Sequence, residues 1–367
     1  MAGVDVSVLV PEGWSVRRLQ GRLIEISYEN KGRGNSPKPM IIPARLKIEE
    51  EFMVAVGMIL GDGKLSADIR HVGFSSIDSE MIVRVLKFYR ERFLIGLEHF
   101  TITIRCKEYE EGLLEEWAAT LGVPVEKLKL HETSRTRRPS CEIQLSSTIF
   151  RRIFGNLISE LMNGDFLKEK TLRRGFLRGL FAAEGNVGIN DKRNYIVSIQ
   201  FCLGSHEKNL ACLLKKALHM EGIKHNQTVS GSSLIIRMTS WENYHKCWKI
   251  NLFSANKRKE IRFLNKLQRT RFSCRIKPAL QKRILDDTNT SRRQLMFLAK
   301  AHTSLAGKII NDDVLIKLEY LLLLARLQMV PLEEVKAGMR DFNVNDVTPI
   351  RDKEFIAFVV DVKACYI

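Results

Sequence analysis

The sequence lacks the cysteine patterns that stabilise small secreted domains or bind zinc. Its seven cysteines are scattered, their number is odd, and no two of them form a CxxC pair. Neither a disulfide framework nor a zinc cluster is expected, and a reducing, intracellular compartment suits the chain best.

Secretion and membrane signals are also missing. The N-terminus has no basic segment followed by an apolar run, so no signal peptide is predicted. The most apolar stretch, Leu318–Val330, contains Glu319 and Arg326 and is too short to span a bilayer. We therefore expect no membrane partner.

Acidic residues are the scarcer charge. The 367 residues include 42 Asp and Glu against 59 Lys and Arg, a net charge of +17. This excess disfavours cations as main partners and favours a polyanion, most often nucleic acid. Residues 1–274 hold 44 of the basic and 30 of the acidic residues, so the polyanion should bind mainly there.

Composition and pattern divide the chain into four segments. They are a short β-rich N-terminal extension (1–45), a first half (46–165), a second half (166–270) and a mainly helical C-terminal accessory domain (271–367). In the outer segments we expect strands at Val4–Val10, Leu23–Tyr28 and Glu354–Val362, and helices at Arg292–Ile310, at Asp312–Met329 and after Pro331.

The two middle segments repeat one pattern. EEFMVAVGMILGDGKL (50–65) opens the first copy and LRRGFLRGLFAAEGNV (172–187) opens the second. Each copy continues as alternating strands, a helix, further strands and a closing helix. Self-similarity on this scale predicts a pseudo-two-fold pair of α/β units.

Small residues line one face of each opening helix. Gly57 and Gly61 are four positions apart, and so are Gly179 and Ala183. Residues at this spacing share a helix face, and small ones allow two helices to approach backbone to backbone. These four residues are the predicted helix–helix interface.

Each opening helix then ends in an acid followed by glycine, at Asp62 and Glu184, with the glycine expected as a left-handed stop. A carboxylate at this end opposes the helix dipole, at a cost of about 0.3–1 kcal/mol, which suggests that a cation compensates. Packing about a two-fold axis would bring both acids together, and oxygen ligands of this kind suit Mg²⁺.

These residues carry a family resemblance over 46–270. AVGMILGDG (55–63) and LRGLFAAEG (177–185) resemble the two motifs of the LAGLIDADG homing endonuclease family. The resemblance implies an α+β fold of two αββαββα halves that form a saddle across double-stranded DNA, in a protein that acts as a monomer. It also implies that Asp62 and Glu184, with Gly61 and Ala183 beside them, bind Mg²⁺, with Mn²⁺ as a substitute, and that each acid directs one strand cut.

The family also has a basic and a polar residue near each active site, on the strands. Aligning the two copies makes Gln144 and Arg237 equivalent, and we predict them as further catalytic residues. Lys64 and Gln200 are the other candidates.

DNA should be read by the polar faces of the strands, where Arg and Gln contact base edges and Lys contacts phosphate. Three arginines fall in a turn expected to be a hairpin tip, at 134–138. The predicted DNA-binding residues are Lys64, Arg105, Lys107, Lys127, Lys129, Arg135, Arg137, Arg138, Lys192, Arg193, Gln200, Lys224 and Gln227.

Two alternatives stay open beside a sequence-specific endonuclease. One is a transcription regulator that keeps the fold and binds DNA without cutting it, and the other is an RNA-splicing maturase. The two acids favour the nuclease, because a regulator has no need for them. The long C-terminal segment keeps the regulator in consideration.

Overall fold

The computed structural model describes residues 3–29, 36–64, 71–134, 136–190, 195–270, 272–286, 316–327, 329–344, 348–349 and 353–365. They form two compact units. One comprises Met1–Asn186, Gln200–Met238 and Cys247–Lys259, and the other Val187–Ile199, Thr239–Lys246 and Glu260–Ile367. The mixture of helices and sheets confirms the α+β class. The four-segment division stays a prediction.

The N-terminal extension contains two small antiparallel sheets. Strand β1 (Gly3–Asp5) pairs with β5 (Arg45–Lys47), and β2 (Ser15–Arg18), β3 (Leu23–Ser27) and β4 (Met40–Pro43) form the other. The predicted strand Val4–Val10 is wrong beyond Asp5, because a 3₁₀ helix, Val6–Leu9, follows. The Asp5 carboxylate causes this turn by accepting a hydrogen bond from the Ser7 backbone N–H at 2.9 Å.

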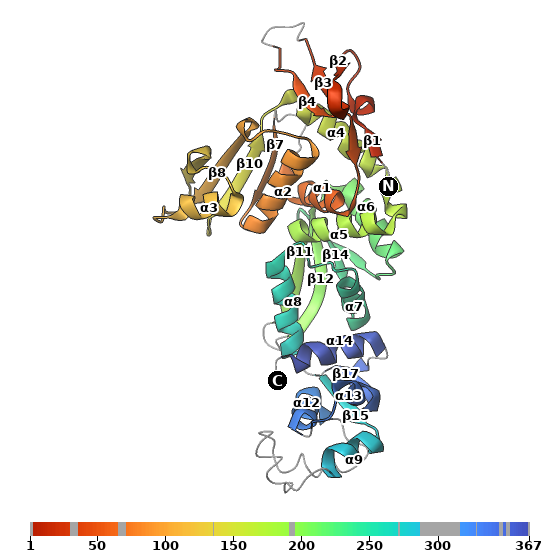
Figure 1. Ribbon diagram of the computed structural model, residues 1–367. Coiled ribbons are helices and arrows are strands. Elements are labelled where there is room, and N and C mark those ends of the chain that lie inside the picture. Colours follow the sequence, from red (N-terminus) through yellow and green to blue (C-terminus); the bar gives the residue numbers. More distant parts are fainter. Residues whose placement is uncertain are drawn as a thin grey trace. The chain divides into compact units, whose positions relative to one another are not determined.

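The first copy builds a five-stranded sheet in the order β6-β7-β10-β8-β9, with α2 against β7 and β10 (Figure 1). Its elements are α1 (Glu50–Asp62), β6 (Gly63–Lys64), β7 (Val72–Ser76), α2 (Ser79–Arg92), β8 (Phe100–Cys106), α3 (Leu113–Leu121), β9 (Leu128–Glu132), β10 (Ser140–Leu145) and α4 (Thr148–Met162). Alternating buried residues on β8 and β10 turn one sheet face toward the helices.

The second copy gives a four-stranded sheet in the order β11-β12-β14-β13. Its elements are α5 (Lys170–Glu184), β11 (Gly185–Asn190), β12 (Tyr195–Gly204), α6 (Lys208–Met220), β13 (Asn226–Ser230), β14 (Ser233–Met238) and α7 (Trp241–Lys249). This order repeats β6-β7-β10-β8 strand for strand, which confirms the predicted duplication. Strand β9 and helix α3 are additions to the first copy.

Aromatic side chains form the core of the first copy. Phe52 of α1 stacks edge-on against Phe88 of α2, and Phe93 packs against Phe150 and Phe154 of α4. All but Phe88 are fully buried. This cluster holds the three helices together above the sheet.

The predicted hairpin tip at 134–138 is wrong. Strand β9 pairs in parallel with β8, and β10 pairs antiparallel with the other edge of β8. The segment between β9 and β10 therefore crosses over β8 and does not join neighbouring strands. The alternation of polar and apolar residues cannot distinguish a hairpin from a crossover, because both place polar residues between two strands.

The C-terminal segment contains a sheet that the sequence analysis missed. Its strands lie in the order β16-β15-β17-β18. Helix α8 (Lys257–Arg269) precedes this segment. The described elements within it are β15 (Phe272–Ile276), α9 (Pro278–Asp286), β16 (Ile316–Lys317), α12 (Leu318–Leu327), α13 (Leu332–Gly338), β17 (Met339–Val344), β18 (Thr348–Pro349) and α14 (Lys353–Ala364). Across the described ranges, no helix is both long and apolar enough to span a bilayer.

The predicted strand Glu354–Val362 is also wrong, because this stretch is helix α14. Its buried residues Phe355, Val359 and Lys363 recur every four positions, which is the period of a helix face. A short apolar run of this kind is ambiguous by pattern alone. The predicted helix at Arg292–Ile310 lies outside the described residues.

Helices α1 and α5 pack backbone to backbone. A Cβ atom added to Gly179 would lie 1.9 Å from the Val54 carbonyl oxygen, and one added to Gly57 would lie 2.5 Å from that of Phe176. A Cβ on Gly61 would lie 2.5 Å from the Cβ of Ala183. The structure thus places all four predicted interface residues at this contact, where no larger side chain fits.

We expect Gly179→Ala to lower the free energy of unfolding by about 1–3 kcal/mol, because the added methyl group would force the two backbones apart. Gly155→Ala is the matched control, since Gly155 lies in α4 with nothing within 4 Å of its added Cβ. The control should stabilise the helix by about 0.5–1 kcal/mol. Urea unfolding of both variants measures the difference, and an unchanged Gly179→Ala protein would contradict the close packing.

Candidate active site at the ends of α1 and α5

Asp62 and Glu184 are the last residues of α1 and α5. The glycines after them are not left-handed, as the sequence analysis expected, because φ is −83° at Gly63 and −77° at Gly185. Close approach explains the glycines instead. A Cβ on Gly63 would lie 2.1 Å from the carbonyl oxygen of Ile59, and one on Gly185 would lie 2.3 Å from that of Phe181.

The helix packing brings the two acids together. The Glu184 Cγ lies 3.0 Å from the position of a Cβ on Gly61, the neighbour of Asp62. Burial, and then the charges of Asp62 and Glu207, raise the pKa of Glu184 to about 7. Burial also raises the pKa of Asp62, against the lowering effect of the Lys259 charge, although its side chain keeps contact with solvent. The acids thus form a pair that resists double ionisation.

Lys259 supplies a cation at this pair. Its Nζ donates to the carbonyl oxygens of Phe181 at 3.0 Å, Ala182 at 2.7 Å and Ala183 at 2.9 Å, which lie in the last turn of α5. Burial lowers the pKa of Lys259 to about 8, while the charges of Asp62 and Glu184 act to raise it. The expected compensating cation is therefore, in part, a side chain of the protein.

The N-terminus of α8 holds Lys259 in place. The Asn256 carboxamide oxygen accepts the Lys259 backbone N–H at 3.1 Å, and its nitrogen donates to the Ala182 carbonyl at 3.3 Å. Asn256 is 1% exposed. It caps α8 and ties this helix to the end of α5.

An open cavity of about 340 Å³ lies at this site. Its lining comes from α1, α2, α5, β7, β10 and the start of α8, with Ile77 and Asn256 beside them. Asp62, Ser75, Ser76, Ile77, Met81, Ser140, Ala182, Ala183, Asn256, Arg258 and Lys259 line it. One carboxylate, two cations and several hydroxyl groups thus face a space large enough for a phosphate group.

Two of the four predicted metal ligands fit a divalent ion. Asp62 and Glu184 present carboxylate oxygens that lack full charge compensation, which suits a hard cation. Ala183 fits poorly, because its carbonyl oxygen already accepts a hydrogen bond from Lys259. Within the part of the chain that the structure describes, no cluster of three or more His, Cys, Asp and Glu residues could hold a metal.

Residues 171–249 match the family model of the LAGLIDADG-like domain. The protein contains a LAGLIDADG-like domain. The match covers α5, its terminal acid and the strands of the second copy, and the first copy repeats the same order of elements.

Several solved structures resemble this chain. The homing endonuclease I-DmoI in complex with DNA and Mn has 13% identity over 56% of this chain and 97% of its own, with a TM-score of 0.35. I-WcaI bound to its DNA recognition sequence has 13% identity over 59% and 87%, with a TM-score of 0.37. Full-length WhiA from Thermotoga maritima has 13% identity over 87% and 92%, with a TM-score of 0.34.

At these identities and TM-scores the likenesses establish neither an activity nor a partner for this chain. A comparison with curated protein sequences gives no match.

On the sheet of the first copy, the predicted strand residues gather around a carboxylate that the prediction missed. Glu142 of β10 forms ion pairs with Lys64 of β6 and Arg105 of β8, and the Gln144 amide donates to its Oε1 at 3.2 Å. Burial opposes the charge of Glu142, but the bonds from Lys64 and Gln144 and the two cations hold its pKa below the usual range. Glu142 therefore stays ionised.

On the second sheet, Arg237 of β14 and Gln200 of β12 lie together. The Arg237 Nε donates to the Gln200 Oε1 at 3.3 Å. Arg237 and Gln144 are each the next-to-last residue of equivalent strands, β14 and β10. Gln144 and Arg237 thus lie at matching positions in the two copies, whereas Lys64 of β6 and Gln200 of β12 lie on strands that are not equivalent.

The remaining predicted DNA-binding residues are more scattered. Lys129 is an exposed residue of β9 that lies opposite Thr103 of β8, and Lys127 precedes β9. Lys107 follows β8, Lys224 precedes β13, and Arg137 and Arg138 are exposed in the crossover segment. Arg135, Lys192 and Arg193 lie outside the described residues.

The placement of Gln227 on the open sheet face is wrong. Its carboxamide oxygen accepts a hydrogen bond from Lys215 of α6 at 2.8 Å, so the side chain lies on the helix side. Gln227 is opposite the buried Ile236, and the open-face neighbours on β13 are Asn226 and Thr228. The error is a shift of one residue, which reverses the face in a strand.

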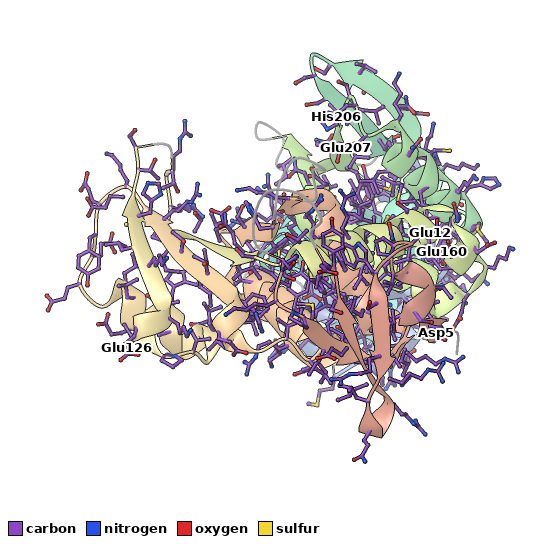
Figure 2. All side chains as sticks on the ribbon, turned by 90° about the horizontal axis from the view of Figure 1, so that it is seen from above. Asp5, Glu12, Glu126, Glu160, His206 and Glu207 are labelled. Atoms are coloured by element: carbon purple, nitrogen blue, oxygen red, sulfur yellow. The ribbon has the colours of Figure 1, made fainter. Side chains whose placement is uncertain are left out.

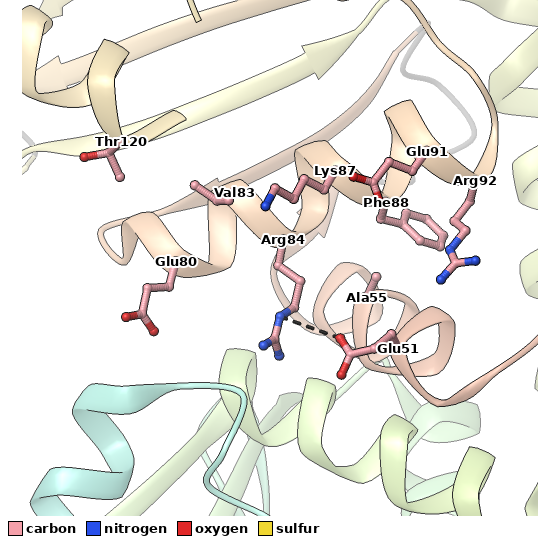
Figure 3. A pocket seen from close by; sticks show the side chains of 10 residues that line it. All are labelled: Glu51, Ala55, Glu80, Val83, Arg84, Lys87, Phe88, Glu91, Arg92 and Thr120. Atoms are coloured by element: carbon pink, nitrogen blue, oxygen red, sulfur yellow. Dashed lines mark ion pairs between the residues drawn. The ribbon is translucent and has the colours of Figure 1, made fainter. Parts of the chain in front are cut away.

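A larger cavity of about 560 Å³ lies between α1, α2 and α3, and neither acid of the pair lines it (Figure 3). Its polar lining has three acidic and three basic residues, and the Arg84 Nε lies 3.9 Å from a Glu51 carboxylate oxygen. None of the predicted site residues lines it. Its balanced charge gives no preference for a phosphate, so the smaller cavity is the candidate site.

Lys259 and Arg258, which line the cavity beside Asp62, are not among the residues predicted from the sequence. A signal for them was present, because Lys257–Arg258–Lys259 places three cations in the first turn of a helix, where they oppose the helix dipole. The same argument from the helix dipole points to Asp62 and Glu184, which are acids at the C-terminal ends of helices. The misplaced charges compensate one another.

The raised pKa of Glu184 predicts a pH-dependent stability in the metal-free protein. Because its folded pKa of about 7 exceeds its unfolded value, this group stabilises the fold below about pH 4.5, and that contribution is lost as the pH rises through 7. Glu184→Gln should therefore flatten the fall in Tm between about pH 5 and 8 in EDTA. Glu126→Gln, at an exposed acid, should keep the wild-type slope, and equal slopes in all three proteins would contradict the burial of Glu184.

Proposed function

We propose that this protein is a sequence-specific DNA endonuclease that makes a metal-dependent double-strand break. The observation that carries the proposal is the pairing of Asp62 and Glu184 at the adjoining ends of α1 and α5, beside a cavity lined by cations. Two acids placed against their helix dipoles cost stability, and a centre that binds a metal and a phosphate is a use for them.

Asp62 and Glu184 would hold Mg²⁺ or Mn²⁺, and a bound metal supplies activation of water and neutralisation of charge on the phosphate. The Arg258 and Lys259 cations face the same cavity as Asp62, where they stabilise negative charge on a phosphate. Gln144 and Arg237 lie at equivalent places on the two sheets, where they orient the two DNA strands. Because both copies lie in one chain, we also propose that the protein acts as a monomer, inside the cell.

The strand faces would bind duplex DNA. The basic residues of both sheets stand on open strand faces or next to them, and a net charge of +17 favours a polyanion. Base-edge contacts from Arg105 and Gln200 would add sequence preference to phosphate contacts from lysines.

One specific observation favours a non-cleaving regulator as the second candidate. Lys259 already binds the carbonyl oxygen of Ala183 and lies near both acids. A centre that carries its own cation has less need of a metal, and DNA binding alone requires none.

A plasmid library with randomised inserts separates the two functions. We expect incubation with Mg²⁺ to give linear DNA whose ends share one long sequence motif. A protein that selects a motif from the same library but leaves it uncut with Mg²⁺ and Mn²⁺ would support the regulator and contradict the nuclease.

A further inference from the structure

A buried carboxylate holds two basic side chains on the open face of the first sheet. The Glu142 side chain is 2% exposed, whereas those of Lys64 and Arg105 are 41% and 39% exposed. The two cations come from strands on either side of β10, one from β6 and one from β8. Glu142 is therefore covered by the side chains that it binds.

The fold does not require an acid at this position. Glu142 is the third residue of β10, and the third residue of the equivalent strand β14 is Ile235. An apolar side chain thus occupies the matching place in the second copy. Burying an ion pair is weak as a source of stability, because desolvation offsets the attraction. The acid is better explained by what it does to Lys64 and Arg105.

We propose that Glu142 is a positioning residue that gives the first copy its sequence discrimination, by holding Arg105 and Lys64 in one direction and partly neutralising them. This inference rests on the proposed binding of duplex DNA. A free arginine or lysine binds any phosphate in reach, which adds affinity without sequence information. An arginine held in one direction presents its remaining N–H groups to base edges, where guanine is the preferred partner.

The test is the affinity of Glu142→Gln for a random-sequence duplex, measured over a range of salt concentrations. Removing the carboxylate charge frees the two cations for phosphate. We expect tighter non-specific binding, on the order of tenfold at 0.1 M salt, and a slope of log affinity against log salt that steepens by about 0.9 per new contact. Selection by Glu142→Gln from a randomised duplex pool should give a DNA motif whose base preference is weaker only in the half that the first copy binds.

Glu126→Gln is the charge-matched control, because Glu126 is exposed and lies at the edge of the same sheet (Figure 2). It changes the net charge equally and should leave the salt slope and the selected motif unchanged. Glu142→Ile copies the residue of the second copy, should fold, and should behave as Glu142→Gln. In a Lys64→Gln/Arg105→Gln background, Glu142→Gln should have no further effect, since it acts through those two residues.

The outcomes separate this inference from the proposed function. If the wild type binds duplex DNA with a steep salt slope but Glu142→Gln and Glu142→Ile match the Glu126→Gln control, the role of Glu142 is overturned and DNA binding stands. If the effect persists without Lys64 and Arg105, the role is likewise overturned. A wild type without salt-dependent duplex binding would overturn the proposed function and this inference with it.

Discussion

Replacing Asp62 by Asn or Glu184 by Gln is expected to reduce DNA cleavage by at least on the order of a hundredfold. Each change removes one charge from the acid pair at the ends of α1 and α5 and nearly preserves the size of the side chain. Metal binding and charge neutralisation on the phosphate are lost together. DNA binding should survive, because the strand faces are unaltered. The measurement is single-turnover cleavage, with Mg²⁺, of the sequence that the protein selects.

The two strands of the DNA duplex should respond differently to the two substitutions. If each acid serves one scissile phosphate, a single variant should accumulate nicked DNA, and the double variant should leave the DNA intact. Glu160→Gln is the control, since Glu160 lies on α4 (Figure 2) and does not line the cavity at the acid pair. Wild-type cleavage by both single variants would contradict the assigned roles.

The second large effect is that of salt on DNA binding. With about six phosphate contacts, affinity for duplex DNA should fall by about a thousandfold between 50 and 200 mM salt. Lys129→Gln and Arg137→Gln should each reduce the slope of log affinity against log salt by about 0.9, because both side chains are exposed on or near the first sheet.

Lys168→Gln is the matched control for this slope. Lys168 is 82% exposed, but it lies in a short 3₁₀ turn away from the strands and pairs with Asp165 at 2.8 Å. A fluorescence anisotropy titration at several salt concentrations gives all three slopes. If Lys168→Gln flattens the slope as much as Lys129→Gln does, binding is a property of net charge and the strand faces have no special part in it.

The sequence allowed the central part of the fold to be predicted because local patterns specify it. Small residues four positions apart allow a close helix contact, and the structure places Gly57 and Gly179 there. The repeat predicted matching strands, and Gln144 and Arg237 lie at matching places on them. Such inferences need only the period of a helix or strand.

The parts that could not be predicted depend on contacts between distant segments. Lys259 binds a carbonyl group 76 positions earlier in the chain, at Ala183. The parallel pairing of β9 with β8 is likewise a matter of tertiary packing, and alternation alone gives no strand order. Glu142 was overlooked because a polar residue on an open strand face is usually exposed, whereas here two cations cover it.

The central claim is that the acids at the ends of α1 and α5 form a divalent-metal site, and the most direct measurement is a Mn²⁺ titration of the protein followed by electron paramagnetic resonance. The wild type should bind Mn²⁺ at a site that Mg²⁺ displaces, and Asp62→Asn/Glu184→Gln should lose it while remaining folded. Equal Mn²⁺ binding by the wild type and the double variant, or none by either, would contradict the claim.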